Sequence, residues 1–228
     1  MNLTNKDSLA ATLDALNEAF FCAQSLSEFE REQAAQWIAS RQGKVGAYAD
    51  MFAPTKSDFE GGIRLFTGER LRSKGGTAHI LGEEACRALI LLNIPVNDVR
   101  SALDRASHGM MERLKTVEET HSISGWYCCG TCTASLWRHL AVGGLEDAQR
   151  RLEAGMKVLK HHRDGSGGWR RFPFYYTILS LSEIALPSAV EEMRYASPIC
   201  ERYLKRAPKK DSYSQRRYIV AERILERC

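Results

Sequence analysis

The stretch between residues 145 and 186 constrains the fold more than any other part of the sequence. Its first half carries apolar residues at helical spacing: Ala148, Leu152, Met156 and Leu159. Polar residues lie between them, which predicts a helix over 145–162 that buries one face only. After the glycine-rich turn 164–168, the helix predicted over 173–184 is apolar nearly all the way round, as is typical of a helix buried on every side. We therefore expect an outer helix that covers an inner helix.

The same periodicity predicts helices along the rest of the chain, at 8–24, 27–42, 77–93, 97–115, 129–140, 188–206 and 213–227. A capping box of Ser188 and Glu191 is expected to open the helix at 188–206, and Pro198 is expected to break it. The predicted class is all-α.

A glycine-rich insertion at 49–76 is the one segment that indicates strand. Residues 63–66 and 69–72 flank Thr67-Gly68 and could pair as a small hairpin. The alternative is a short helix capped by Ser57 and Glu60.

Length and composition bound the class of protein. With 228 residues, 44% of them hydrophobic, the chain can fold as a single domain, 1–228. It contains no apolar run near eighteen residues and no signal-peptide layout at its N-terminus, so we expect neither a membrane span nor secretion.

Seven cysteines, an odd count, do not form a secreted disulfide framework, and we expect a reduced, cytoplasmic protein. The net charge of +4 comes with no recognised nucleic-acid-binding module, so we expect no nucleic-acid partner.

Two segments repeat one another. Trp37–Tyr48 and Val158–Trp169 both place an apolar pair at a helix end, a long polar residue five positions later, and then Gly-x-aromatic. The pattern resembles the repeat of the α/α-toroid proteins, the protein prenyltransferase β-subunits and squalene–hopene-type cyclases, in which an aromatic–Leu–x3–Gln segment leads to Gly–x–Trp. Phe174-Tyr175-Tyr176-Thr177 is also similar to an inner-helix start of the prenyltransferase β-subunits.

This resemblance implies outer and inner helix pairs around a central cavity, with the inner-helix N-termini at one mouth. The chain is short for a closed toroid, so an open or reduced ring, completed by a second copy in a homodimer, is expected. It departs from the family in lacking the Asp-x-Asp-Asp and Asp-Asp-x-x-Asp motifs, and the position of the prenyltransferase zinc histidine is Tyr176.

The expected mouth contains a cysteine cluster, with three cysteines in five residues. Cys128 and Cys132 share one face if the helix begins at Cys128, and Cys129 with Cys132 is the other possible pair. His79 and Glu83 show the same four-residue spacing on another inner helix. Two thiolates, an imidazole and a carboxylate suit tetrahedral zinc, so these four are the predicted metal ligands. The alternative is that the cysteines are small buried apolar residues.

Residues around the same mouth are candidates for substrate binding. Aromatic side chains would line the cavity, and arginines would bind an anion such as a diphosphate or carboxylate. The predicted substrate-binding residues are Trp126, Trp169, Tyr175, Arg70, Arg72 and Arg171. The predicted catalytic residues are Cys128, Cys132, His79 and Tyr176.

The leading hypothesis is therefore an enzyme that performs transfer or cyclisation on an isoprenoid or thiol-bearing substrate, one that is small and hydrophobic or anionic. The alternative is a non-catalytic protein that uses the cavity or an open ring edge to bind a peptide, a small hydrophobic ligand or a protein partner.

Overall fold

The computed structural model describes residues 3–71, 73–120, 125–206 and 211–228. These residues form two compact units. The first comprises Met1–Ile63, Arg70–Thr120 and Val142–Glu146, and the second comprises Arg64–Glu69, His121–Ala141 and Asp147–Cys228. The expectation of a single domain stays a prediction.

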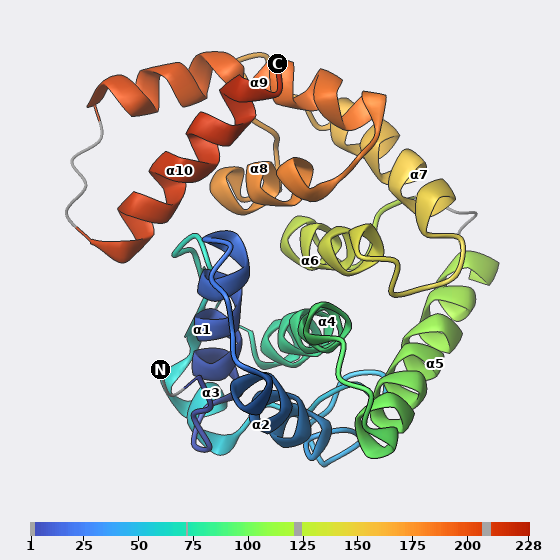
Figure 1. The fold of residues 1–228 in the computed structure, drawn as a ribbon. Helices are drawn as coiled ribbons and strands as arrows, with labels where there is room; N and C mark the ends of the chain where they lie inside the picture. Colours follow the sequence, from blue (N-terminus) through green and yellow to red (C-terminus); the bar gives the residue numbers. More distant parts are fainter. Residues whose placement is uncertain (1–2, 72, 121–124, 207–210) are drawn as a thin grey trace. The chain divides into compact units, whose positions relative to one another are not determined.

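The first unit is built around one buried helix. Its helices are α1 (Leu9–Phe21), α2 (Glu28–Ala39), α3 (Lys56–Gly61), α4 (Lys74–Leu92) and α5 (Asn97–Thr120). Helix α4 is buried along most of its length and packs against α1, α2 and α5 (Figure 1). It starts three residues before the predicted Thr77, because the Ser73 hydroxyl accepts a hydrogen bond from the Gly76 backbone N–H and caps the helix.

A buried carboxylate joins two helix starts in this unit. Asp58, on α3, accepts hydrogen bonds from the backbone N–H of Leu9, at the start of α1, and from the backbone N–H of Thr55. Both the short helix and the hairpin that the sequence offered as alternatives are present. The cap of the helix is Thr55 with Asp58, in place of Ser57 with Glu60, and the strands are β1 (Ile63–Arg64) and β2 (Arg70–Leu71).

The described residues of the second unit form a bundle of five helices, α6 (Gly130–Ala141), α7 (Ala148–His161), α8 (Phe174–Glu183), α9 (Pro187–Arg206) and α10 (Ser212–Glu226). Helices α6 and α8 pack side by side and are the most buried; α7 packs against α6 and α9, and α10 against α8 and α9 (Figure 1). The expected layering of amphipathic helices over apolar ones therefore holds within this unit. However, the main inner-helix partner of α7 is α6, which precedes it in the chain, and not α8.

Two predictions about α9 are wrong. The helix begins at Pro187, whose missing N–H costs nothing in the first turn, so Ser188 lies inside the helix instead of capping it. The helix also continues through Pro198. The Ser197 hydroxyl donates a 2.8 Å hydrogen bond to the carbonyl of Arg194, the group that the N–H of residue 198 would otherwise bond.

The two repeat segments form similar turns. Gln42 pairs with Phe52 in an isolated antiparallel bridge, and Arg163 pairs with Trp169 in the same way. The long polar residue of each copy therefore starts a reversal of the chain, although the reversal after Gln42 is longer.

Among the described residues, no helix combines the length and apolar character needed to cross a membrane.

Candidate thiol site at the N-terminus of α6

Three cysteines gather where the chain enters α6. Helix α6 begins at Gly130, one residue after the predicted start at 129, so Cys129 occupies the N-cap position and Cys128 lies before the helix. The Sγ atom of Cys129 accepts a hydrogen bond from the backbone N–H of Cys132 at 3.5 Å. The Sγ atoms of Cys128 and Cys132 lie within 4.8 Å of each other. The three cysteine thiols therefore form one cluster, in place of three separate apolar side chains that only fill space in the core.

Hydrogen bonds between the Thr133 side chain and the backbone fix the segment that leads into α6. The Thr133 hydroxyl donates to the carbonyl of Tyr127 at 2.6 Å and accepts from the Tyr127 N–H at 2.9 Å, so the segment folds back over the first turn of α6. Cys128 then adopts φ +27°, a conformation that is unfavourable for a residue with a side chain. Strain of this kind persists only where surrounding contacts enforce it, and it is frequent at functional sites.

Gly130 has no room for a side chain. A Cβ atom at this position would lie 2.2 Å from the carbonyl oxygen of Arg171. The backbone of 171–172 therefore packs directly against the start of α6, which places the predicted Arg171 next to the cysteine cluster.

The three thiols differ in their acidity. Hydrogen bonds from the thiol of Cys128, and then from that of Cys132, lower the pKa of Cys129, and backbone N–H groups at the start of α6 contribute further. The hydrogen bond to Cys129 raises the pKa of Cys128, and hydrogen bonds to Cys128 and then to Cys129, together with burial, raise the pKa of Cys132. The cluster therefore favours one thiolate, on Cys129.

Exposure separates the cysteines further. Cys128 and Cys129 are exposed to solvent, whereas Cys132 is buried beneath them. Elsewhere in the unit, burial raises the pKa of Cys200 to about 12, as is usual for a structural thiol. The sequence offered Cys129 only as the alternative partner of Cys132, and not among the predicted catalytic or metal-binding residues. Its signal was the spacing Cys129-Gly130-Thr131-Cys132 at a helix start.

Aromatic and cationic residues border the cluster. Trp126 is partly buried and stacks on His162, with ring centroids 4.9 Å apart, and its ring meets Phe172 edge-on. The guanidinium of the exposed Arg171 lies 5.9 Å from the centroid of the Trp126 ring. Two of the predicted substrate-binding residues, Trp126 and Arg171, therefore lie together beside the thiols.

Two of the other predicted residues of this unit, Trp169 and Tyr176, are buried. Trp169 is buried and donates its indole N–H to Glu192 at 2.9 Å. Tyr176 is also buried, and the Arg138 guanidinium lies 5.7 Å from the centroid of its ring. Tyr175 is partly exposed, with Tyr203 at 5.0 Å between centroids.

The remaining predicted residues belong to the first unit. His79 is buried, its Nε2 atom lies 3.1 Å from a carboxylate oxygen of Glu83, and its ring stacks on that of Tyr48 at 4.6 Å. Glu83 therefore contacts the imidazole itself. Arg70 is exposed at the start of β2, and Arg72 lies outside the described residues.

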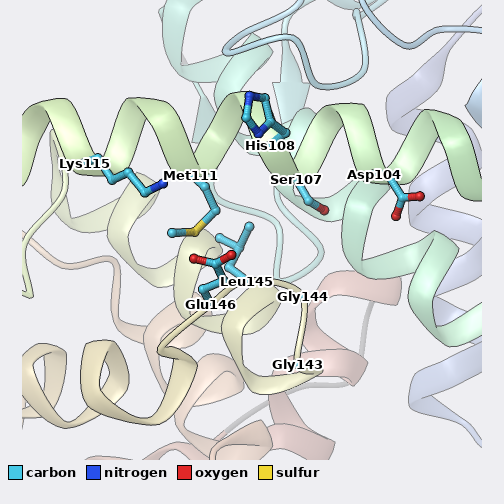
Figure 2. A pocket seen from close by; sticks show the side chains of 9 residues that line it. All are labelled: Asp104, Ser107, His108, Met111, Lys115, Gly143, Gly144, Leu145 and Glu146. Atoms are coloured by element: carbon cyan, nitrogen blue, oxygen red, sulfur yellow. The ribbon is translucent and has the colours of Figure 1, made fainter.

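The first unit also contains an open cavity of about 500 Å³ between α5 and the segment 143–146. Figure 2 shows the Met111 side chain reaching from α5 toward Leu145 and Glu146. Acidic and basic side chains both line it, Asp104 and Glu146 with Lys115, so its charge favours no particular ligand.

The fold and the cluster define the class: a helical protein with a thiol site at a helix N-terminus. No family model, no curated protein and no solved structure matches this chain.

Proposed function

We propose that the protein is a zinc-thiolate enzyme that transfers a group to or from the sulfur of a thiol-bearing substrate. The observation that carries this proposal is the spacing of Cys128 and Cys132, whose sulfurs lie within 4.8 Å of each other at the start of α6.

The spacing fits the preferred geometry of zinc. Two sulfurs that each lie about 2.3 Å from a tetrahedral zinc ion are about 3.8 Å apart. A small rotation of the exposed Cys128 side chain would reach that separation, because Cys128 precedes the rigid part of the helix. Zinc bound there would hold a substrate thiol as its thiolate at neutral pH.

The surroundings support an anionic substrate. Arg171 presents an exposed guanidinium beside Trp126, so one substrate could stack on the indole while a carboxylate or phosphate pairs with the arginine. Arg70 and Arg72 stay predicted contacts of the same substrate.

His79 stays a predicted zinc ligand, on the contacts that it makes within the first unit. Its support is the contact between Nε2 and the Glu83 carboxylate, because metal-bound histidines usually bond a carboxylate through the nitrogen that does not hold the metal. Because Glu83 contacts the imidazole, we propose that Glu83 orients His79. This role is favoured over the predicted role of Glu83 as a direct zinc ligand. A toroidal arrangement of the helices is part of the proposal, and the layering within the second unit supports it.

Metal analysis tests the proposal. Purified protein should contain about one zinc per chain, and a Cys128→Ser/Cys132→Ser variant should contain almost none. The matched control is Cys22→Ser/Cys228→Ser, which removes two other exposed cysteines and should keep the metal. His79→Ala should lower the zinc content, whereas Glu83→Gln should weaken zinc binding less.

Cobalt in place of zinc tests whether the site binds the sulfur of a thiol-bearing substrate. In cobalt-substituted protein, a thiol-bearing ligand should intensify the sulfur-to-cobalt absorption, and Arg171→Ala should weaken the response to an anionic thiol more than to a neutral one. Protein that binds no metal under any condition would overturn the zinc proposal and favour the non-catalytic alternative.

A further inference from the structure

Cys129 and Cys132 have a relationship that zinc binding does not need. The Cys129 sulfur lies over the first turn of α6, 3.5 Å from the backbone nitrogen of Cys132. The Cys132 sulfur is only three bonds from that nitrogen, so rotation about the Cys132 Cα–Cβ bond can bring the two sulfurs near each other. Residues three apart in a helix have Cα atoms about 5 Å apart, which lies within the range of about 4.4–6.8 Å that a disulfide spans.

We propose that Cys129 and Cys132 form a dithiol–disulfide exchange pair, in which the exposed Cys129 attacks and the buried Cys132 resolves. This goes beyond the zinc site, because the exchange takes place in metal-free protein.

The order of the two steps follows from accessibility. Cys129 is exposed, so a small disulfide can approach its sulfur in line with the bond that breaks. Cys132 is 2% exposed, and a second external disulfide cannot reach it, although the sulfur of Cys129 can. The backbone N–H of Cys132 donates to the attacking sulfur and holds it over the first turn of α6.

The chemistry balances with a small-molecule disulfide as oxidant. The Cys129 thiolate attacks one sulfur of the disulfide, forms a mixed disulfide and releases the other half as a thiolate. The Cys132 thiol then loses its proton to solvent, attacks the Cys129 sulfur and releases the second thiolate. Two cysteine thiols are oxidised to one disulfide, the external disulfide is reduced to two thiols, and the proton count is conserved.

Glutathione disulfide is the probe. Full-length protein, freed of metal with EDTA, is titrated in mixtures of reduced and oxidised glutathione, quenched with acid and digested. Mass spectrometry should find a peptide that links Cys129 to Cys132, and dithiothreitol should remove this link.

Variants separate the two roles. Cys132→Ser should stop at the mixed disulfide and carry one glutathione on Cys129. Cys129→Ser should form neither the internal disulfide nor an adduct at Cys132. Cys128→Ser is the matched control and should form the internal disulfide as the original protein does, and circular dichroism should show the same helical content in all variants.

Other outcomes would overturn the proposal. They are a Cys128–Cys132 link in the original protein, loss of the internal disulfide in Cys128→Ser, or glutathionylation of Cys129 no faster than that of the exposed Cys22. The zinc proposal fails independently of these, because it is decided by metal content and by the effect of Cys128, which the exchange pair does not use.

Discussion

The sulfur of Cys129 caps α6 by accepting the backbone N–H of Cys132. An N-cap is usually a hydroxyl or carboxylate oxygen, so this helix presents a nucleophilic atom where most helices present a passive one. The relationship places a reactive thiol and a buried thiol within one turn.

The alkylation rate of Cys129 should depend only weakly on pH. The hydrogen bond from Cys128, and then that from Cys132, lowers the pKa of Cys129, so its thiolate persists as the pH falls below about 8.5, the ordinary value, and is lost only when the pH falls through the lowered pKa. Between pH 8.5 and 6, the rate for a cysteine peptide should fall more than a hundredfold, whereas that for Cys129 should fall several-fold at most. Competitive alkylation by iodoacetamide in EDTA, read by mass spectrometry, measures both. If the alkylation rates of Cys129 and of the peptide fell in parallel with pH, the pKa of Cys129 would not be lowered, which would contradict this prediction.

Gly130→Ala should destabilise the protein. The added Cβ would lie 2.2 Å from the Arg171 carbonyl oxygen, and a backbone contact of this kind is relieved only by moving the start of α6, at a cost of about 2 kcal/mol. Urea unfolding measures the loss.

Gly75→Ala is the matched control. Gly75 also lies in the first turn of a helix, but a Cβ there meets no atom within 4 Å. This variant should keep or slightly raise the free energy of unfolding, because alanine favours the helix by up to about 1 kcal/mol. Equal losses in the two variants would refute the packing argument.

Two adjacent glutamates should respond differently to removal. Glu192 is buried and accepts hydrogen bonds from Arg163 at 2.9 Å and from the Trp169 indole at 2.9 Å. Glu192→Ala leaves both donors without their acceptor and should cost about 3 kcal/mol. Glu191 pairs with Lys160 at 3.5 Å on the surface, with both side chains more than half exposed, so Glu191→Ala should change stability by less than about 1 kcal/mol. Thermal and urea unfolding of the two variants gives the comparison, and similar values would contradict the assigned burial.

Ser197 and Pro198 should be energetically coupled. The Ser197 hydroxyl bonds the Arg194 carbonyl because Pro198 has no N–H to do so. Ser197→Ala should therefore cost about 1 kcal/mol in the original protein and close to nothing in a Pro198→Ala background, where the backbone bond is restored. Pro198→Ala alone should raise stability by about 1 kcal/mol or more. A double-mutant cycle measures the coupling, and additive effects would exclude it.

Helix positions followed from the sequence because they depend on periodicity and on caps that are local in the chain. The buried character of α8 was predicted from neighbouring residues, and caps such as Ser27 with Glu30, which bond each other at the start of α2, are also made by neighbours in the chain. Ser197 could have indicated that α9 continues through Pro198. The indication is that its hydroxyl can bond the Arg194 carbonyl, which has no N–H donor at residue 198.

The cysteine cluster was predicted as a group, but its internal order was not. The sequence by itself determined that the chain is helical, that amphipathic helices cover apolar ones, and that three thiols lie close together at the start of one helix. Only the tertiary structure decided which thiol caps that helix and which is buried. These depend on where α6 begins, and at that point Gly130 packs against the backbone at Arg171, forty-one residues away in the chain. Periodicity extends over a few turns of helix, whereas a contact of this kind exists only once the distant segment has packed.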